Sequence, residues 1–104
     1  MEIVELLERA RERLGVSSDR ALCRELRIAG RALIDYRRGN SLPTDDRMMR
    51  ICDAARVSPE AGLLMLNMWR VDGEARATYR KLLKLWEENG GVLYRESQIK
   101  NKAA

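Results

Sequence analysis

Hydrophobic residues recur every three to four positions along six stretches of this chain, and that spacing is typical of amphipathic helices. Alternating patterns that would predict strands are absent, β-branched residues are sparse and only two prolines occur. The sequence therefore predicts an all-α fold. The expected helices span residues 2–14, 19–26, 30–38, about 45–55, 61–70 and 74–89.

Capping residues and helix breakers separate these stretches. Gly15 is expected to end the first helix, and Ser17 or Ser18 is expected to cap the second. A sharp stop is predicted at Gly39, because glycine adopts the left-handed conformation without steric cost. Thr44 is a suitable N-cap for the fourth helix, and Pro59 suits the first turn of the fifth.

The 61–70 helix is apolar nearly all round, which predicts burial on more than one side. One face is expected to pack on the 19–38 helix pair, and the other on the 74–89 helix or on a second subunit. The chain contains no Phe and only 5% aromatic residues, so the core must be aliphatic. The apolar stripe expected on the last helix consists of Ala75, Tyr79, Leu82, Leu83 and Trp86.

Charge and composition narrow the possible functions. The formal net charge is +4, and residues 20–50 carry eight arginines against four acids, the footprint expected of a phosphate-binding face or of a solvated basic surface. Without histidine, imidazole metal sites and histidine-based acid–base catalysis are excluded. Cys23 and Cys52 are interpreted as small hydrophobes of a reducing cytoplasm. We expect no enzyme activity, catalytic residue, cofactor, metal, signal peptide or membrane span.

Two short helices joined by a short turn, as expected at 19–26 and 30–38, form a helix-turn-helix, a motif that places its second helix in the major groove of DNA. Residues 18–66 resemble the lambda-repressor-like (Cro/repressor, XRE-type) DNA-binding family. The resemblance rests on Leu22, Cys23, Leu26, Ile28, Leu33-Ile34-Asp35-Tyr36, Arg38-Gly39-Asn40 and Pro43. It implies a five-helix DNA-binding domain over residues 1–70. Residues 71–104 would add a C-terminal helix and tail for packing or dimerisation, as in small phage or prophage regulators.

The resemblance also implies roles for single residues. Base-reading positions would be Gly30, Arg31, Ile34 and Asp35. Arg31 could donate two hydrogen bonds to guanine, while Asp35 could accept from cytosine or pair with Arg31 one turn away. Phosphate-binding positions would be Ser18, Arg20, Arg37, Arg38 and Asn40. Tyr36 is expected to pack in the core rather than to read bases.

The sequence departs from the family pattern in two places. Arg27 stands where a glycine usually follows the second helix, so a differently shaped turn is one expectation. Ala29 and Gly30 stand where polar residues usually open the recognition helix. Few side chains would then read bases, and DNA shape would carry part of the specificity.

The resulting prediction is a cytoplasmic, sequence-specific transcriptional regulator, a repressor or Cro-like protein that binds double-stranded DNA as a homodimer. Partner-interface candidates are Trp69, Tyr79, Leu83 and Trp86, with the two tryptophans also readable as core anchors. The alternative is a protein-interaction adaptor or antitoxin-like module that binds a partner through the last two helices. The 92–104 tail is expected either to fray or to order on a partner.

Overall fold

Six α-helices make up the part of the chain that the computed structural model describes, residues 1–95. They are α1 (Ile3–Leu14), α2 (Asp19–Leu26), α3 (Gly30–Arg38), α4 (Asp45–Ala55), α5 (Pro59–Arg70) and α6 (Gly73–Glu88). The all-α prediction is confirmed, and each helix lies where the hydrophobic spacing placed it. Five of the six helices lie within residues 1–70, and α6 is the C-terminal helix expected after residue 70.

Local capping explains why the helices begin and end where they do. The side chain of Ser18 accepts a hydrogen bond from the Ala21 N–H at 3.1 Å, and that of Thr44 accepts one from the Arg47 N–H at 3.3 Å. Gly39 ends α3 at φ 76°, where a side chain would be strained. Pro59 occupies the first turn of α5. These sequence predictions are confirmed.

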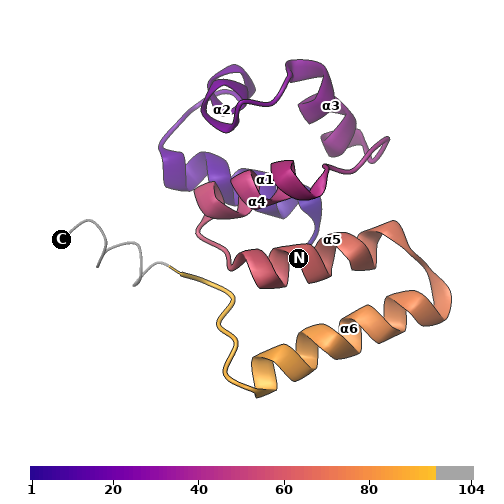
Figure 1. The fold of residues 1–104 in the computed structure, drawn as a ribbon. Coiled ribbons are helices and arrows are strands. Elements are labelled where there is room, and N and C mark those ends of the chain that lie inside the picture. The colour runs from indigo at the N-terminus through magenta and orange to yellow at the C-terminus, as the bar shows by residue number, and fades with distance from the viewer. Residues whose placement is uncertain (96–104) are drawn as a thin grey trace.

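The helices are stacked from one end of the molecule to the other (Figure 1). The α2–α3 pair forms one end, α1 and α4 lie below it, α5 follows, and α6 forms the opposite end. Among the helices, α5 contacts only α4 and α6, while α6 contacts only α5. Burial of α5 on two sides is thus confirmed, but its expected packing on α2–α3 is wrong. The physical reason is that α4 lies between them and contacts both α2 and α5.

The core is aliphatic, as the composition predicted. Fully buried side chains come from α1 to α5, and Tyr36 is the single aromatic residue among the buried side chains of residues 1–95. The centre of the core contains Leu6, Leu7, Leu22, Leu33, Met48, Ile51 and Leu66. None of the helices described is at once long and apolar enough to cross a membrane.

The contact between α4 and α5 depends on two small residues. Gly62 of α5 faces Cys52 of α4, and a Cβ at position 62 would overlap the Cys52 sulfur. Both residues are fully buried, so neither can turn out to solvent. The close approach therefore requires glycine at position 62.

We expect Gly62→Ala to destabilise the fold by about 1–2 kcal/mol, because an added methyl group overpacks a dense core. Denaturant unfolding of the purified protein measures this loss. The double variant Gly62→Ala/Cys52→Ala removes the overlapping sulfur and should recover part of the stability. Equal stability of Gly62→Ala and the wild type would contradict this account of the α4–α5 contact.

Residues 92–95 run back along the turn between α4 and α5, which the sequence did not predict. Val57 and Tyr94 form an isolated antiparallel bridge. The Ser58 N–H donates to the Leu93 carbonyl at 2.8 Å, and the Arg95 N–H donates to the Arg56 carbonyl at 2.9 Å. The expectation of a frayed tail is therefore wrong for residues 92–95; residues 96–104 lie outside the described part of the chain.

Candidate nucleic-acid interface

The α2–α3 pair is held in place by buried side chains on its inner side. Leu22 and Leu26 of α2, Ile28 of the turn and Leu33 of α3 are each at most 4% exposed. The turn between the helices spans residues 27–29. Arg27 adopts the left-handed conformation at φ 55° and ψ 47°, and its N–H donates to the Arg24 and Cys23 carbonyls. Arg27 thus adopts the left-handed conformation that a glycine would adopt at this position. The expectation of a differently shaped turn is therefore wrong at position 27.

Because a left-handed conformation costs a non-glycine residue about 1–2 kcal/mol, Arg27→Gly is expected to stabilise the fold by about 0.5–1 kcal/mol after the entropy of glycine is counted. If Arg27 also faces DNA, the same change weakens DNA binding by removing a positive charge. Thermal unfolding and a duplex-binding titration measure the two effects separately. A destabilised Arg27→Gly protein would contradict the strain at this position.

The outward face of α3 carries the residues predicted to read bases. At about 100° per residue, positions 30, 31, 34, 35 and 38 fall on one continuous side of the helix. Gly30, Arg31, Ile34 and Arg38 are exposed, and Asp35 is partly exposed. We call these five residues the α3 outer face. No ion pair joins Arg31 to Asp35 in the described chain, so the structure does not show the alternative in which they neutralise each other.

Tyr36 lies on the opposite side of α3 and has a structural role. Its side chain is 2% exposed, and its hydroxyl oxygen accepts a hydrogen bond from Arg47 Nη1 at 3.1 Å. The prediction that Tyr36 packs in the core is confirmed.

The N-terminus of α3 is not capped by a side chain. Its N-cap, Ala29, offers no side-chain hydrogen bond, and no acidic residue stands in the first turn. The first N–H groups of a helix have no partner within the helix and form a partly positive end that attracts anions. Ala29 and Gly30 are exposed, and a Cβ at Gly30 would meet no atom within 4 Å. A phosphate could therefore approach these N–H groups closely.

The residues predicted to bind phosphate divide into two groups. Arg20, Arg38 and Asn40 are exposed, and their side chains form no hydrogen bond or ion pair within residues 1–95. Ser18 and Arg37 already have internal partners. Ser18 caps α2 through its hydroxyl oxygen, and Arg37 binds two carboxylates.

Arg37 joins three helices. Its Nε and Nη2 donate to the two oxygens of Asp19 at 2.9 and 2.7 Å, a forked geometry that favours arginine, and Nη2 also donates to Glu8 at 2.8 Å. Glu8 in turn pairs with Arg11 at 3.0 Å. Hydrogen bonds from Arg37 and then from Arg11 hold the pKa of Glu8 below its ordinary value of 4.5. Arg37 therefore fastens α3 to α1 and α2, an internal role that the sequence did not predict.

Arg24 and Arg27 belong to the same surface, although sequence analysis gave them no role. Together with Arg20 they are spaced by four and three residues, which puts all three on one side of α2. All three are exposed and have no side-chain partner within residues 1–95. We call them the α2 arginine stripe. The helical spacing alone could have revealed it.

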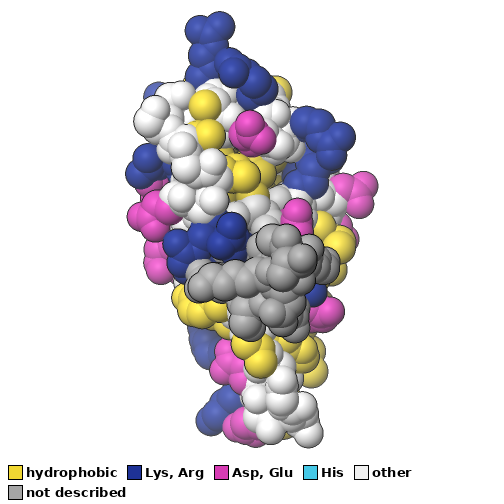
Figure 2. Space-filling view, turned by 90° about the vertical axis from the view of Figure 1, so that its left-hand side faces the viewer, with side chains coloured by type: hydrophobic (Ala, Val, Ile, Leu, Met, Phe, Trp, Pro, Cys, Tyr) yellow, Lys and Arg dark blue, Asp and Glu magenta, His cyan; other side chains and the backbone are white. Residues whose placement is uncertain are grey.

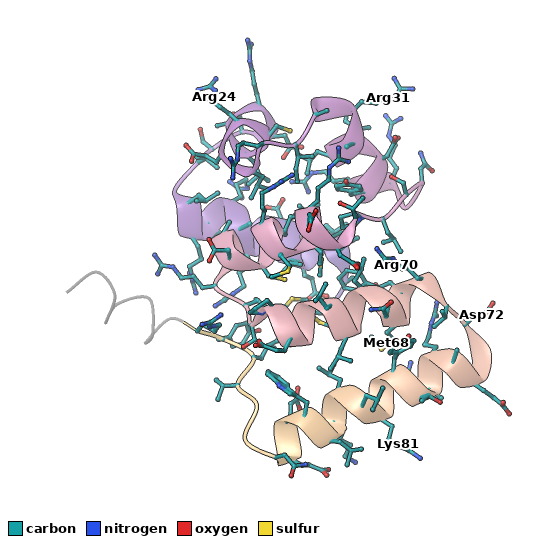
Figure 3. The ribbon with its side chains drawn as sticks, viewed as in Figure 1. Arg24, Arg31, Met68, Arg70, Asp72 and Lys81 are labelled. Atoms are coloured by element: carbon teal, nitrogen blue, oxygen red, sulfur yellow. The ribbon has the colours of Figure 1, made fainter. Side chains whose placement is uncertain are left out.

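The stripe and the α3 outer face share one end of the molecule. Figure 3 shows Arg24 and Arg31 projecting into solvent from α2 and α3, with Lys81 of α6 at the far end. In Figure 2, which shows the left-hand side of Figure 1, Lys and Arg side chains stand at the upper end, where α2 and α3 lie, and others are spread over the middle and the lower end. Within residues 1–95 the arginines without a side-chain partner are Arg20, Arg24, Arg27, Arg31, Arg38, Arg56 and Arg80. Five of these seven lie on this one end.

The four predicted partner-interface residues are partly buried within the chain. Trp69 and Leu83 pack against the hydrophobic core, while Tyr79 and Trp86 lie with Leu83 on the side of α6 that faces α5. The ring of Trp86 also packs against Gly91. The large apolar side chains of α6 that are exposed are instead Leu82 and Leu85.

Within residues 1–95, the remaining reactive groups do not gather into a metal or catalytic cluster. Cys23 and Cys52 are free thiols, and burial raises the pKa of Cys52 to about 12. Burial is also the largest cause that raises the pKa of Cys23. No cluster of three or more His, Cys, Asp or Glu side chains in the described range is placed to hold a metal ion. The arginine-rich end formed by α2, the turn and α3 is therefore the candidate functional site.

Comparisons with known proteins found no match to a family model, to a curated protein or to a solved structure. The functional interpretation therefore depends on the geometry of this surface and on the residues that resemble the lambda-repressor-like family.

Proposed function

We propose that this chain is a transcriptional regulator that binds double-stranded DNA through α3, with α2, the turn and α3 acting as a helix-turn-helix of the lambda-repressor-like kind. The observation that carries the proposal is the gathering of five exposed arginines without internal partners on α2, the turn and α3. Other arginines, such as Arg11, Arg37 and Arg70, pair with acidic side chains. Like charges held together repel one another, and a polyanion relieves that repulsion.

In this arrangement α3 would read bases, and α2 would contribute mainly phosphate contacts. The α3 outer face presents Arg31, whose planar fork fits the two acceptors on the major-groove edge of guanine. The α2 arginine stripe, Arg38 and the open N-terminus of α3 would contact phosphates on either side and set the register without reading sequence. Ile34, 44% exposed, could contact a thymine methyl group. Such a role belongs in the cytoplasm, in accord with two unpaired cysteines.

A salt titration tests the proposal. With Arg20, Arg24, Arg27 and Arg38 on phosphates, log affinity for a duplex should fall with log salt at a slope of about −3 to −4 for each bound chain. Fluorescence anisotropy of a labelled duplex measures this slope. Arg80→Ala, on α6 and outside the α2–α3 pair, is the control and should change neither affinity nor slope. Failure to bind any duplex at about 50 mM salt overturns the proposal and favours the protein-interaction alternative.

A further inference from the structure

Among the helices of residues 1–95, α5 alone contacts α6. Helix α6 is 16 residues long, yet none of its residues is buried. Tyr79, Leu83 and Trp86 are half-buried and share the side that faces α5. An amphipathic helix normally buries its apolar stripe, so the remaining apolar residues of α6 need an explanation.

The two flanks of α6 differ in character. At about 100° per residue, Leu82 and Leu85 lie on either side of a line about a quarter turn around the helix from the side that faces α5. They are 43% and 46% exposed. The opposite flank is charged, with Arg76, Arg80 and Glu87. Apolar surface is thus exposed along one flank of α6 and not along the other.

We propose that this apolar flank binds the same flank of a second copy of the chain, with the two α6 helices antiparallel. In that register Leu82 lies opposite Leu85 of the partner subunit, and Thr78 lies opposite Asn89 of the partner subunit. The pairing follows the heptad spacing of helices that pack side by side, with residues 78, 82, 85 and 89 along the seam. The two-fold symmetry makes each contact occur twice.

Charge supports this partner and this orientation. On the outer edge of the flank, Lys81 comes opposite Glu88 of the partner subunit, and Glu88 comes opposite Lys81 of the partner subunit. In a parallel pair, Lys81 would instead come beside the partner's Trp86, which carries no charge and is half-buried. The sequence of α6 is therefore complementary to itself only in the antiparallel register.

The antiparallel register also determines where the DNA-binding ends point. Two antiparallel helices side by side are related by a two-fold axis normal to the plane that contains them. Since the flank is a quarter turn from the side that faces α5, this axis runs along the helix stack, and both α2–α3 ends lie on the same side of the dimer (Figure 1). This consequence rests on the proposed function, because it allows two recognition helices to face one duplex; the dimer itself does not depend on DNA.

Sedimentation equilibrium without DNA tests the dimer, and circular dichroism confirms that each variant is folded. The wild type should reach twice the 12.0 kDa mass of one chain. Leu85→Glu should raise the dimer dissociation constant at least about tenfold, because it places a carboxylate in an apolar seam. Arg80→Glu, on the opposite flank, should leave the dissociation constant unchanged.

Charge reversal tests the register. Lys81→Glu and Glu88→Lys should each weaken the dimer, and the double variant Lys81→Glu/Glu88→Lys should restore it, since it exchanges the two charges of each pair. A monomeric wild type, a dimer insensitive to Leu85→Glu, or a double variant no better than the single ones overturns the proposal. Because no DNA is present, these results do not depend on whether the chain binds DNA.

Discussion

Alanine at position 31 is expected to weaken binding to the preferred duplex by about 1–3 kcal/mol, roughly five- to 150-fold, and to remove the preference for one base pair. Arg31 is the only arginine of the α3 outer face near the start of the helix, the part that enters the major groove in a helix-turn-helix. It is exposed and has no partner in the described chain. Its guanidinium is therefore free to form two hydrogen bonds to guanine.

The measurement is a competition titration against duplexes that differ at one base pair, selected beforehand from a random pool. Arg31→Lys is the matched control, because lysine keeps the charge and loses the fork. It should bind random duplex as the wild type does, yet discriminate poorly among bases. If Arg31→Ala lost equal affinity for the preferred and the random duplex, Arg31 would not be reading a base.

The helix boundaries could be predicted because they depend on residues close together in the sequence. Ser18, Thr44, Gly39 and Pro59 act within one turn of their own positions. The exposed side of α3 was predictable for the same reason, since helical periodicity determines which residues share a side. What these residues bind is a different question, and periodicity does not answer it.

The relations that sequence analysis missed connect residues far apart in the chain. The pairing of Arg37 with Glu8 spans 29 positions, and the contact between Ser58 and Leu93 joins a turn to a segment that follows α6. Nothing in the pattern of α5 indicated that α4 would lie between it and α2. On α6, the stripe predicted as one surface divides into a half-buried side and an exposed flank, because only one helix covers it.

The neighbouring residues Arg37 and Arg38 should respond to alanine in opposite ways. Arg37→Ala is expected to lower the free energy of unfolding by about 2–3 kcal/mol, since it removes three charge-assisted hydrogen bonds that join α3 to α1 and α2. The partly exposed carboxylates of Asp19 and Glu8 regain water, which limits the loss. Arg38→Ala, on the α3 outer face, should leave stability unchanged within about 0.5 kcal/mol.

DNA binding should show the opposite order, with the larger effect at Arg38 and the smaller one at Arg37. Arg38→Ala should weaken binding to every duplex alike and reduce the salt slope by about one, while the folded Arg37→Ala protein should keep the wild-type slope.

The dependence of stability on pH adds an independent test of Arg37. The lowered pKa of Glu8 means that its stabilising contribution is present above pH 4.5 and is lost as the pH falls toward the lowered value. The stability gap between the wild type and Arg37→Ala should therefore narrow below about pH 4.5, and a constant gap would show that Arg37 stabilises the fold without Glu8.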